Sequence, residues 1–574
     1  MKRHINNIFA YSTFLILSIA VMSGVLRNIS TVMYGQPGDP FFDIWKSWYF
    51  KYAFLHNKPF YFSDFLGAPF GSDLTQIPYH LFWDKLFFVV TLISNEVFAY
   101  NLFMFLSFFL SGIIMYHLVF YLTRDRAVSI FSGIAYMFCP YHLAHSLGHL
   151  GLASIQWLPL LLLFILKAFD TAELKNFALL SLSLLLVFIS NYYYGVFSYL
   201  IVLVFILSFI IINRVKVTFK IVSSFTISFL IAIILTLIIA LPPYLNTLGR
   251  PIDAPGSTDI TYAAPLKDLF TGSARPLSYL LPSYMHPIFG SFTKLLVGFP
   301  LYGDTETEHS LYLGIFPLIL SWLAIRRRTK ISKLFLILLV ATVIFSMPPY
   351  IKLLSLKIYL PQFFIFKTLP SFRTFARFGI FAMLCISVLA GFGLKELLRR
   401  ARNKKMRVLI YAISIAIVLF EFLVNPFQYK FDLGKAPEVY KWLAQEKGDF
   451  IICEYPLNKA PVFRGDWLIW QRIHGKRTAD VAPHGSYSSR FRKDIFKLQD
   501  ANTPGILKWL GVKYAIVHLD DMKESESLDI VGILPNFNKQ EGLKLVKRFK
   551  ESNIEIYEVT AKPINPESAE GEEL

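Results

Sequence analysis

Two titratable carboxylates, Asp39 and Asp43, lie directly after the first long apolar segment, beside a membrane. The run QPGDP at 36–40 predicts a turn, because proline fixes the backbone and glycine frees it. From Phe41 onward a strongly aromatic amphipathic helix is expected to lie in the headgroup region. Its narrow polar face consists of Asp43, Lys46, Ser47 and Lys51. Asp39 is then either a helix cap or a catalytic carboxylate at the water boundary. Asp43 is either a solvated charge or a second catalytic carboxylate.

Three histidines form a second polar group at a turn between apolar segments. His142, His145 and His149 recur at spacings of three and four, which would stack them on one face of a helix. Imidazoles in this arrangement could bind a metal ion or a phosphate. Histidines at a membrane boundary also serve as plain interfacial hydrogen-bonding groups, so the spacing leaves both interpretations open.

Charged residues also precede two later apolar segments. Glu308 and His309 stand before one of them, and together with Asp39 they could supply ligands to a divalent cation. As an alternative, Glu308 is a rim charge at the membrane surface. Arg373 and Arg377 stand one turn apart before another segment, where an arginine pair could bind a lipid phosphate by bidentate hydrogen bonds or snorkel to ordinary headgroups.

The composition is that of an integral membrane protein. Hydrophobic residues make up 55% of the 574 residues and charged residues 17%, and the mean hydropathy is +0.50. The net charge is +18, but the basic residues stand in short runs between apolar segments, where they set topology. This placement argues against binding of nucleic acid. The cysteines Cys139, Cys385 and Cys453 form no metal or disulfide pattern.

About eleven segments are long and apolar enough to cross roughly 30 Å of hydrocarbon. They cover approximately 8–26, 97–122, 127–145, 149–168, 176–190, 195–212, 219–241, 311–325, 333–347, 374–394 and 407–424. Basic clusters fall on every second connection, which predicts a multi-pass protein of the cytoplasmic membrane with a cytoplasmic N-terminus. The outer loops are then 27–96, 242–309 and 348–373. Trp157 and Tyr192–Tyr194 are interpreted as an interfacial aromatic belt.

The predicted fold is an all-α polytopic membrane domain over residues 1–429, with juxtamembrane helices in the first outer loop, and a small extracytoplasmic α/β domain over 430–561. In that domain we expect helices at 438–445 and 505–510 and strands at 449–455, 513–518, 543–549 and 554–559. The segment 562–574 predicts a disordered acidic tail. The run QRIHGKRTAD at 471–480 predicts a polar turn, and its aromatic neighbours Trp467 and Trp470 either face an acceptor or dock on the membrane domain.

Several sequence patterns together resemble the GT-C superfamily of membrane glycosyltransferases, and within it the YfhO-like branch. They are PGDPFFDIW after the first span, HLAHSLGHLGLASIQWLPL at 142–160, PSYMHPIFG at 282–290, EHSLYLGIFPLIL at 308–320, SFRTFARFGIFAM at 371–383 and LKWLGVKYAIVH at 507–518. The resemblance implies transfer of a sugar from a polyprenyl-phosphate carrier to a glycan, lipid or protein acceptor on the extracytoplasmic side.

Such a transfer is a displacement at the anomeric carbon, and it needs a general base for the acceptor hydroxyl. Asp39 matches the position of the family's catalytic acid. Many relatives have a second acid directly after it, where this chain has Pro40. Asp43, one turn further on, is therefore a candidate to share the catalytic role.

The resemblance also assigns binding residues. His145, His149 and Glu308 match positions that line the pocket, and Arg373 and Arg377 are expected to hold the carrier phosphate. Members of the superfamily differ in their need for metal, so a divalent cation is a candidate cofactor.

Two other classes of function fit a membrane protein of this kind. A transporter or flippase of a lipid-linked sugar would be expected to show internal repeats and ionisable residues buried within its spans; the sequence shows no repeat, and its spans are nearly free of mid-membrane charge. A non-catalytic scaffold would position other envelope enzymes through its C-terminal domain. The scaffold hypothesis predicts that Asp39→Asn leaves function intact.

Overall fold

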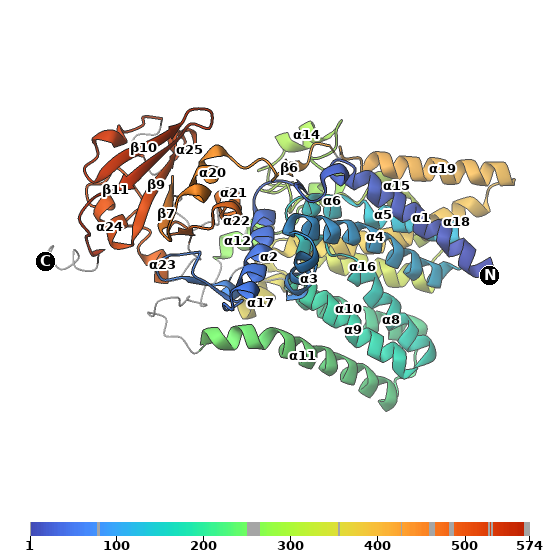
Figure 1. Ribbon diagram of the computed structural model, residues 1–574. Coiled ribbons are helices and arrows are strands. Elements are labelled where there is room, and N and C mark those ends of the chain that lie inside the picture. Colours follow the sequence, from blue (N-terminus) through green and yellow to red (C-terminus); the bar gives the residue numbers. More distant parts are fainter. Residues whose placement is uncertain are drawn as a thin grey trace.

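The computed structural model describes residues 2–76, 81–248, 265–353, 356–425, 427–457, 465–481, 487–525, 528–529 and 532–566. The helices form an elongated body, and a β-sheet lies beyond one end of it (Figure 1). Residues 249–264 of the predicted outer loop and 567–574 of the predicted tail lie outside the described residues.

Helices make up most of the chain before the sheet. They are α1 (Lys2–Met22), α2 (Asp39–Leu55), α3 (Leu81–Ile93), α4 (Glu96–Thr123), α5 (Arg126–Met137), α6 (Pro140–Ser146), α7 (Leu150–Ala153), α8 (Trp157–Thr171), α9 (Leu174–Ser190), α10 (Tyr192–Asn213), α11 (Phe219–Leu248), α12 (Leu266–Thr271), α13 (Pro276–Leu280), α14 (Gly290–Leu295), α15 (Ile315–Arg326), α16 (Lys330–Ser346), α17 (Pro361–Thr368), α18 (Gly379–Arg399) and α19 (Lys404–Glu421). Short 3₁₀ turns occur at η1 (Leu26–Asn28), η2 (Leu74–Gln76) and η3 (Phe375–Phe378), and two small hairpins pair β2 (Phe62–Ser63) with β3 (Ser72–Asp73) and β4 (Tyr350–Leu353) with β5 (Leu356–Tyr359).

Fewer helices reach full membrane length than the predicted eleven or so. Within the described residues five segments are long and apolar enough to span: Glu96–Thr123, Leu150–Thr171, Tyr192–Asn213, Phe219–Leu241 and Phe375–Arg399. A sixth candidate joins α5 to α6 through a bend of 44°. Other apolar helices are shorter; α9, with 17 residues, rises only about 26 Å at 1.5 Å per residue. An apolar window in the sequence does not reveal where a helix ends. The number of spans predicted from the sequence was therefore higher.

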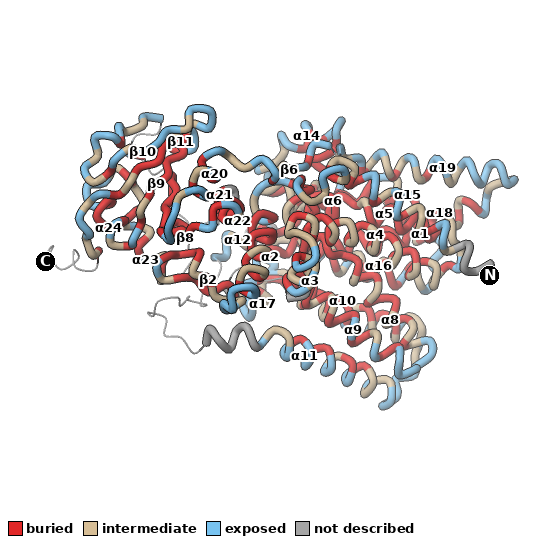
Figure 2. Tube along the Cα trace, in the orientation of Figure 1, coloured by how far each residue is buried: buried red, intermediate tan, exposed pale blue. Residues whose placement is uncertain are grey.

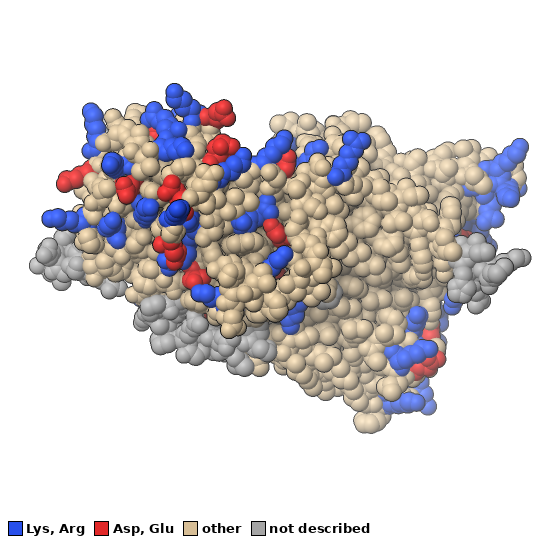
Figure 3. Space-filling view, viewed as in Figure 1, with Lys and Arg blue, Asp and Glu red and all other residues tan. Residues whose placement is uncertain are grey.

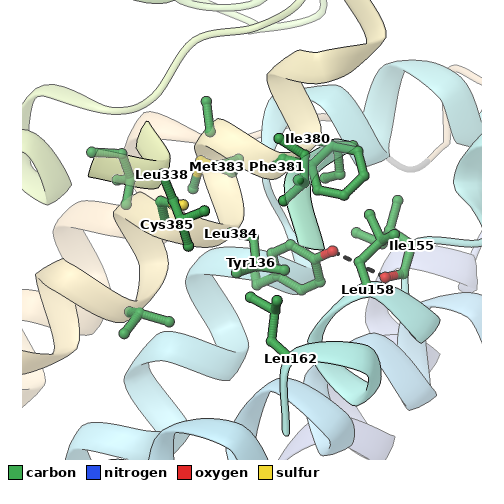
Figure 4. Packing of buried hydrophobic residues seen from close by; sticks show 14 of the residues in the cluster. Tyr136, Ile155, Leu158, Leu162, Leu338, Ile380, Phe381, Met383, Leu384 and Cys385 are labelled. Atoms are coloured by element: carbon green, nitrogen blue, oxygen red, sulfur yellow. Dashed lines mark hydrogen bonds between the residues drawn. The ribbon is translucent and has the colours of Figure 1, made fainter. Parts of the chain in front are cut away.

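The helical core is centred on α18, whose sequence is apolar on nearly every side. It packs against α5, α15 and α16. Figure 4 shows Phe381 of α18 near Tyr136 of α5, whose hydroxyl donates to the carbonyl of Ile155 at 2.9 Å. A Cβ on Gly393 would lie 1.9 Å from the carbonyl oxygen of Leu320, so glycine is needed for the close contact with α15. In Figure 2, α11 and α19 lie at the outside with mostly exposed surfaces.

The C-terminal part holds a five-stranded mixed sheet in the order β10-β11-β9-β7-β8. Its strands are β7 (Ile451–Tyr455), β8 (Arg477–Thr478), β9 (Val512–His518), β10 (Leu543–Phe549) and β11 (Ile554–Val559), with helices α20 (Glu438–Gln445), α21 (Gly465–Leu468), α22 (Gln471–His474), α23 (Tyr487–Arg490), α24 (Thr503–Trp509) and α25 (Leu519–Lys523) and the turn η4 (Phe537–Lys539). The strand β7 is parallel to β8 and β9, and the β9–β11–β10 pairs are antiparallel. Four of these strands, β7, β9, β10 and β11, begin and end within two residues of the predicted ones, and β8 was not predicted.

The C-terminal part is joined to the first loop of the helical body at several points. The strand β1 (Val32–Tyr34) pairs with β6 (Lys430–Asp432), and α21 and α22 pack on α2. Inside this contact the indole N–H of Trp45 donates to Oε1 of Gln471 at 2.8 Å. Arg472 forms an ion pair of 2.6 Å with Glu96 at the start of α4. The polar run at 471–480 therefore begins with residues that dock on the helical body, while Trp467 stacks on His518 and Trp470 on Tyr440 of the C-terminal part.

Candidate functional site

Asp39 is the first residue of α2, where the helix dipole stabilises an anionic side chain. Gly38 occupies the cap position with φ of 123°, a backbone conformation that favours glycine. Asp39 is thus not the helix cap that the sequence allowed as an alternative. Its Oδ2 lies 3.2 Å from Nε2 of His149, and its side chain is 72% exposed.

A close approach of two backbones places Asp39 beside His149. The N–H of Gln36 donates to the carbonyl oxygen of Leu147 at 2.8 Å. A Cβ on Gly35 would lie 2.4 Å from that same oxygen, so a larger residue would separate the two segments. His149 itself stands in the break between α6 and α7. The turn before α2 and the break after α6 therefore form one unit.

Glu308 and Arg377 form a bidentate ion pair in which both side chains are 16% exposed. Nη2 of Arg377 lies 2.6 Å from Oε1 of Glu308, and Nε lies 3.1 and 3.3 Å from its two oxygens. Burial alone would raise the pKa of the Glu308 carboxyl. The guanidinium of Arg377 and the ring of His145 have a larger opposite effect, so the pKa is lowered to about 2. Glu308 is therefore a fixed anion at neutral pH.

His145 lies between the two pairs. Its Nε2 is 3.8 Å from Oε2 of Glu308, and its ring centre is 5.6 Å from that of His149. The side chain is fully buried, yet neither ring nitrogen has a hydrogen-bond partner among the described residues. Buried polar atoms without partners are rare and often belong to ligand sites. The structure thus forms a row of five predicted residues: Asp39, His149, His145, Glu308 and Arg377.

His142 does not belong to this row. Its Nδ1 lies 2.7 Å from the carbonyl oxygen of Met137, and its Nε2 lies 3.3 Å from the hydroxyl of Ser107. The prediction that three histidines share one helical face is wrong, because α6 ends at Ser146 and the helix is broken before His149.

Arg373 also points elsewhere. Its Nη1 donates to Oδ2 of Asp268 on α12 at 2.7 Å, and its side chain is 48% exposed. The two arginines are connected indirectly through Tyr193. The hydroxyl of Tyr193 accepts the backbone N–H of Arg373 at 3.2 Å, and its ring centre lies 4.3 Å from the guanidinium carbon of Arg377.

The predicted metal set of Asp39, Glu308 and His309 is not assembled. The ring of His309 is engaged elsewhere, with Nε2 3.0 Å from the carbonyl oxygen of Ser273 and Nδ1 3.0 Å from that of Thr305. In the part of the chain that the structure describes, no group of three His, Cys, Asp or Glu side chains could hold a metal ion.

The polar face of α2 is buried rather than solvated. Asp43, Lys46 and Ser47 are 6%, 1% and 2% exposed. Lys46 lies 2.8 Å from Asp84 and 4.0 Å from Asp43, while the hydroxyl of Ser47 lies 2.7 Å from that of Thr91. The expectation of a polar face toward water is wrong, because α3 supplies these partners. Burial raises the pKa of Asp43 to about 7, against the opposing effect of Lys46.

Two residues that contact the candidate site residues or the polar face of α2 were not predicted from the sequence. Tyr193 was interpreted as part of an aromatic belt, and nothing in its local sequence indicates that it lies against Arg377. Asp84 did leave a signal, as the acid of the charged pair Asp84–Lys85 within the mostly apolar run LFWDKLFFVVTLI of α3. A charge at such a position usually has a buried partner.

The arrangement of helices is similar to that of solved GT-C glycosyltransferases. No family model matches the sequence, and no curated protein matches it significantly. Among solved structures, the archaeal oligosaccharyltransferase AglB from Archaeoglobus fulgidus, in complex with an inhibitory peptide and a dolichol-phosphate, aligns with a TM-score of 0.54 and 12% identity, over 98% of this chain and 75% of that one. ArnT from Cupriavidus metallidurans aligns with a TM-score of 0.54 and 11% identity, over 98% and 100%.

The arabinofuranosyltransferase AftD from Mycobacteria aligns with a TM-score of 0.56 and 13% identity, over 98% of this chain and 42% of that one. Identities this low show a shared fold and do not transfer an activity. The expected GT-C fold is confirmed, whereas the YfhO-like branch stays a prediction.

Proposed function

We propose that this protein is a membrane glycosyltransferase that moves a sugar from a polyprenyl-phosphate carrier to an acceptor on the extracytoplasmic side. The observation that carries the proposal is the row from Asp39 to Arg377, which brings an accessible carboxylate, two histidines and a partly buried arginine together. The GT-C fold supports it, and AglB, a structural neighbour, was solved with a dolichol-phosphate.

In the proposed reaction the acceptor hydroxyl attacks the anomeric carbon while the bond from that carbon to the carrier phosphate breaks. Asp39 takes the hydroxyl proton, and the carrier leaves as a phosphate anion. Asp39 suits this role because it is exposed and held by His149, whereas Glu308 is bound on both oxygens by Arg377. Asp43 supports the site through its buried contact with Lys46.

Arg377 is the proposed ligand of the carrier phosphate. Its hydrogen bonds to described residues use Nε and Nη2, which leaves Nη1 for an anion. Arg377 stands at the opposite end of the row from Asp39, so the proposed arrangement has the base at one end of the site and the leaving phosphate at the other. The exposed Arg373 is proposed to bind the same phosphate from the surface. To do so it would give up its ion pair with Asp268.

The test is single-turnover transfer from a panel of radiolabelled polyprenyl-phosphate sugars by the purified protein, with membrane lipid extract as acceptor source, with and without Mg²⁺ or Mn²⁺. We expect Asp39→Asn to lower the rate by about 10²- to 10⁴-fold, the contribution typical of a general base. Asp64→Asn, an exposed acid in the same loop, is the matched control. Equal transfer by wild type and Asp39→Asn would contradict the role of Asp39 as the base, and no transfer by the wild type with any donor would favour the transporter or scaffold function.

The proposed orientation places the C-terminal sheet and the site outside the cell. Ser552→Cys near the sheet and Lys175→Cys at the turn between α8 and α9 provide the two labelling positions, since the native cysteines are buried. In intact cells a membrane-impermeant thiol reagent should label position 552 only. Labelling of position 175 alone would reverse the orientation and overturn the proposed side of action.

A further inference from the structure

A cavity of about 250 Å³ lies between α4 and α8, which pack against each other, and it shares no residue with the row described above. Glu96, the first residue of α4, contacts the C-terminal part through Arg472. The helix has 28 residues, so its other end, next to the cavity, lies about 42 Å away at 1.5 Å per residue. In Figure 3, Lys and Arg side chains gather at the end of the helical body that is remote from the C-terminal sheet. The proposed orientation assigns this end to the cytoplasmic side.

Each helix lines the cavity with one face, because its lining residues recur mainly at spacings of three and four. These residues include Ile114, His117, Tyr121 and Arg124 on α4 and its C-cap, and Leu160, Leu163 and Lys167 on α8. On both helices the cation comes last. Along the helix axis, Arg124 stands about 15 Å from Ile114, and Lys167 about 10 Å from Leu160. The cavity is therefore cationic at the helix ends and apolar toward the middle of the helices.

Aromatic rings hold the two cations of the cavity. The ring centre of Tyr121 lies 5.2 Å from the guanidinium carbon of Arg124 and 5.9 Å from Nζ of Lys167. Nζ of Lys167 also lies 5.0 Å from the ring centre of Phe164. Neither cation takes part in an ion pair among the described residues. A ring face orients a cation and leaves N–H groups free to donate to a phosphate, so both cations are available at the same end of the cavity.

The other polar side chains of the cavity are engaged inside the protein. Nε2 of His117 lies 2.8 Å from the hydroxyl of Tyr11, and the hydroxyl of Tyr121 donates to Asp170. Asp170 is exposed, and the described residues that line the cavity include no Asp or Glu. A concave surface with two cations and no acid in its wall attracts an anion.

A larger cavity lacks this combination. A space of about 650 Å³ between α5, α18 and α19 is also lined by cations, among them Lys404 and Arg407. The exposed apolar side chains of α19, such as Met406, Leu409 and Ile413, lie on the opposite face of that helix. Cations and apolar surface are thus separated there, whereas between α4 and α8 they follow one another within one cavity.

We propose that the cavity between α4 and α8 binds an anionic phospholipid, with its phosphate held by Arg124 and Lys167 and an acyl chain against Ile114, Leu160 and Leu163. The phosphate and the chain of such a lipid follow each other in the order in which the cavity presents its cations and its apolar wall. Ile114 and Leu160 are only partly buried, which leaves the apolar wall open to a chain. Basic pockets between membrane helices on the cytoplasmic side suit anionic headgroups. The proposal does not depend on the transfer reaction.

The experiment measures the midpoint of thermal unfolding of the delipidated full-length protein in detergent during titration with phosphatidylglycerol, phosphatidylcholine or glycerol 3-phosphate. A ligand that binds only the folded state raises the midpoint in a saturable way. We expect phosphatidylglycerol to do so. Phosphatidylcholine lacks the net negative charge and glycerol 3-phosphate lacks the acyl chains, so neither should raise the midpoint over the same concentration range. This comparison uses the wild type and therefore tests the proposal even where a substitution impairs folding.

The test variant is Arg124→Gln/Lys167→Gln. Each cation near an anionic headgroup contributes about fivefold in affinity, so this variant should bind phosphatidylglycerol roughly 25-fold more weakly. Arg124→Lys/Lys167→Arg keeps both charges and should bind within about threefold of the wild type. The matched control is Arg326→Gln/Lys333→Gln, which removes two exposed cations outside the cavity, one of them over the ring of Trp322 at 4.6 Å, and it should keep the wild-type response.

Three results would each overturn the proposal. They are equal losses of affinity in the test and control variants, no loss in the test variant, and a saturable rise with phosphatidylcholine or glycerol 3-phosphate that equals the rise with phosphatidylglycerol.

Discussion

The ring of His149 faces the carboxylate of Asp39 at 3.2 Å, although the long helix α4 separates them in the chain. An N–H at Nε2 would hold the carboxylate in place, and a hydrogen bond to a charged group contributes about 1.5–3 kcal/mol. We therefore expect His149→Phe to lower kcat by about 10- to 100-fold, with little change in KM for the donor. His149→Gln, which keeps a donor group, should lose less.

The control for this prediction is His56→Phe. His56 is an exposed histidine at the C-terminal end of α2, the helix that begins with Asp39. Its kcat should equal that of the wild type. The same loss in His149→Gln and His149→Phe would show that the ring fills space and does not orient Asp39.

The Glu308–Arg377 pair predicts an acid-dependent contribution to stability. The folded-state pKa of Glu308 is lowered from 4.5 to about 2, so the contribution is complete above the unfolded value and is lost as the pH falls through that interval. The shift corresponds to roughly 3 kcal/mol. Glu308→Gln should be less stable by about this amount near neutral pH.

This contribution is measured by chemical unfolding in detergent from about pH 6 to about pH 2, across the interval in which the carboxylate is protonated. The difference between wild type and Glu308→Gln should shrink toward the acid end. Glu306→Gln, from the same loop, should follow the wild type throughout. A difference that does not change with pH would show that the ion pair is not its source.

Local elements were predictable because they depend on local patterns. The strands at 451–455, 512–518, 543–549 and 554–559 follow apolar runs or alternation, and the structure has them within two residues of the expected positions. The spans were harder to count. Helix ends inside apolar stretches, such as the bend between α5 and α6, leave little trace in composition.

The site could be predicted as a set of residue types and only in part as a geometry. Asp39, His149, His145, Glu308 and Arg377 come together, as the resemblance implied for pocket residues. The directions of side chains were not accessible from the sequence. His309 turns to a backbone carbonyl and the stripe around Lys46 faces α3, because partners from distant segments decide both outcomes.

The two arginines before α18 should differ in their effect on donor binding. Arg377 is partly buried and fixed by Glu308, while Arg373 is half exposed and paired with Asp268. Lysine cannot reproduce a bidentate guanidinium. We expect Arg377→Lys to raise KM for the polyprenyl-phosphate donor by about tenfold or more and Arg373→Lys by about threefold or less. Steady-state kinetics with donor as the varied substrate distinguishes them, and a larger effect at Arg373 would reverse the proposed assignment.

Lys46 is expected to be essential for the folding of the first loop. It is 1% exposed and lies between Asp84 and Asp43. Replacing one partner of a buried ion pair leaves an uncompensated charge and costs about 3–5 kcal/mol. Lys46→Met should lower the free energy of unfolding by this amount, and Lys51→Met, on the same helix but only partly buried, should lower it by about 1 kcal/mol.

A double variant separates charge from packing at this position. Lys46→Met/Asp84→Asn removes both charges of the closer pair, so it should recover part of the stability lost in Lys46→Met. Chemical unfolding of the wild type, Lys46→Met, Asp84→Asn and the double variant gives the coupling energy. A double variant that is less stable than Lys46→Met alone would mean that packing of the lysine chain, and not its charge, is what the fold requires.

The C-terminal part is predicted to position the catalytic helix through Gln471. Its Oε1 accepts the indole N–H of Trp45 on α2 at 2.8 Å, and its Nε2 donates to the carbonyls of Phe65 and Lys476 at 3.0 Å each. Since Asp39 begins the same helix, Gln471→Met should reduce kcat about tenfold at temperatures where the protein is still folded, with donor KM unchanged. Gln540→Met, remote from α2, is the matched control.

A double variant tests whether Gln471 acts through Trp45. Trp45→Phe/Gln471→Met should be no slower than Gln471→Met alone, because both changes remove the same contact. Full additivity of the two losses would show that Gln471 acts on Asp39 by another route.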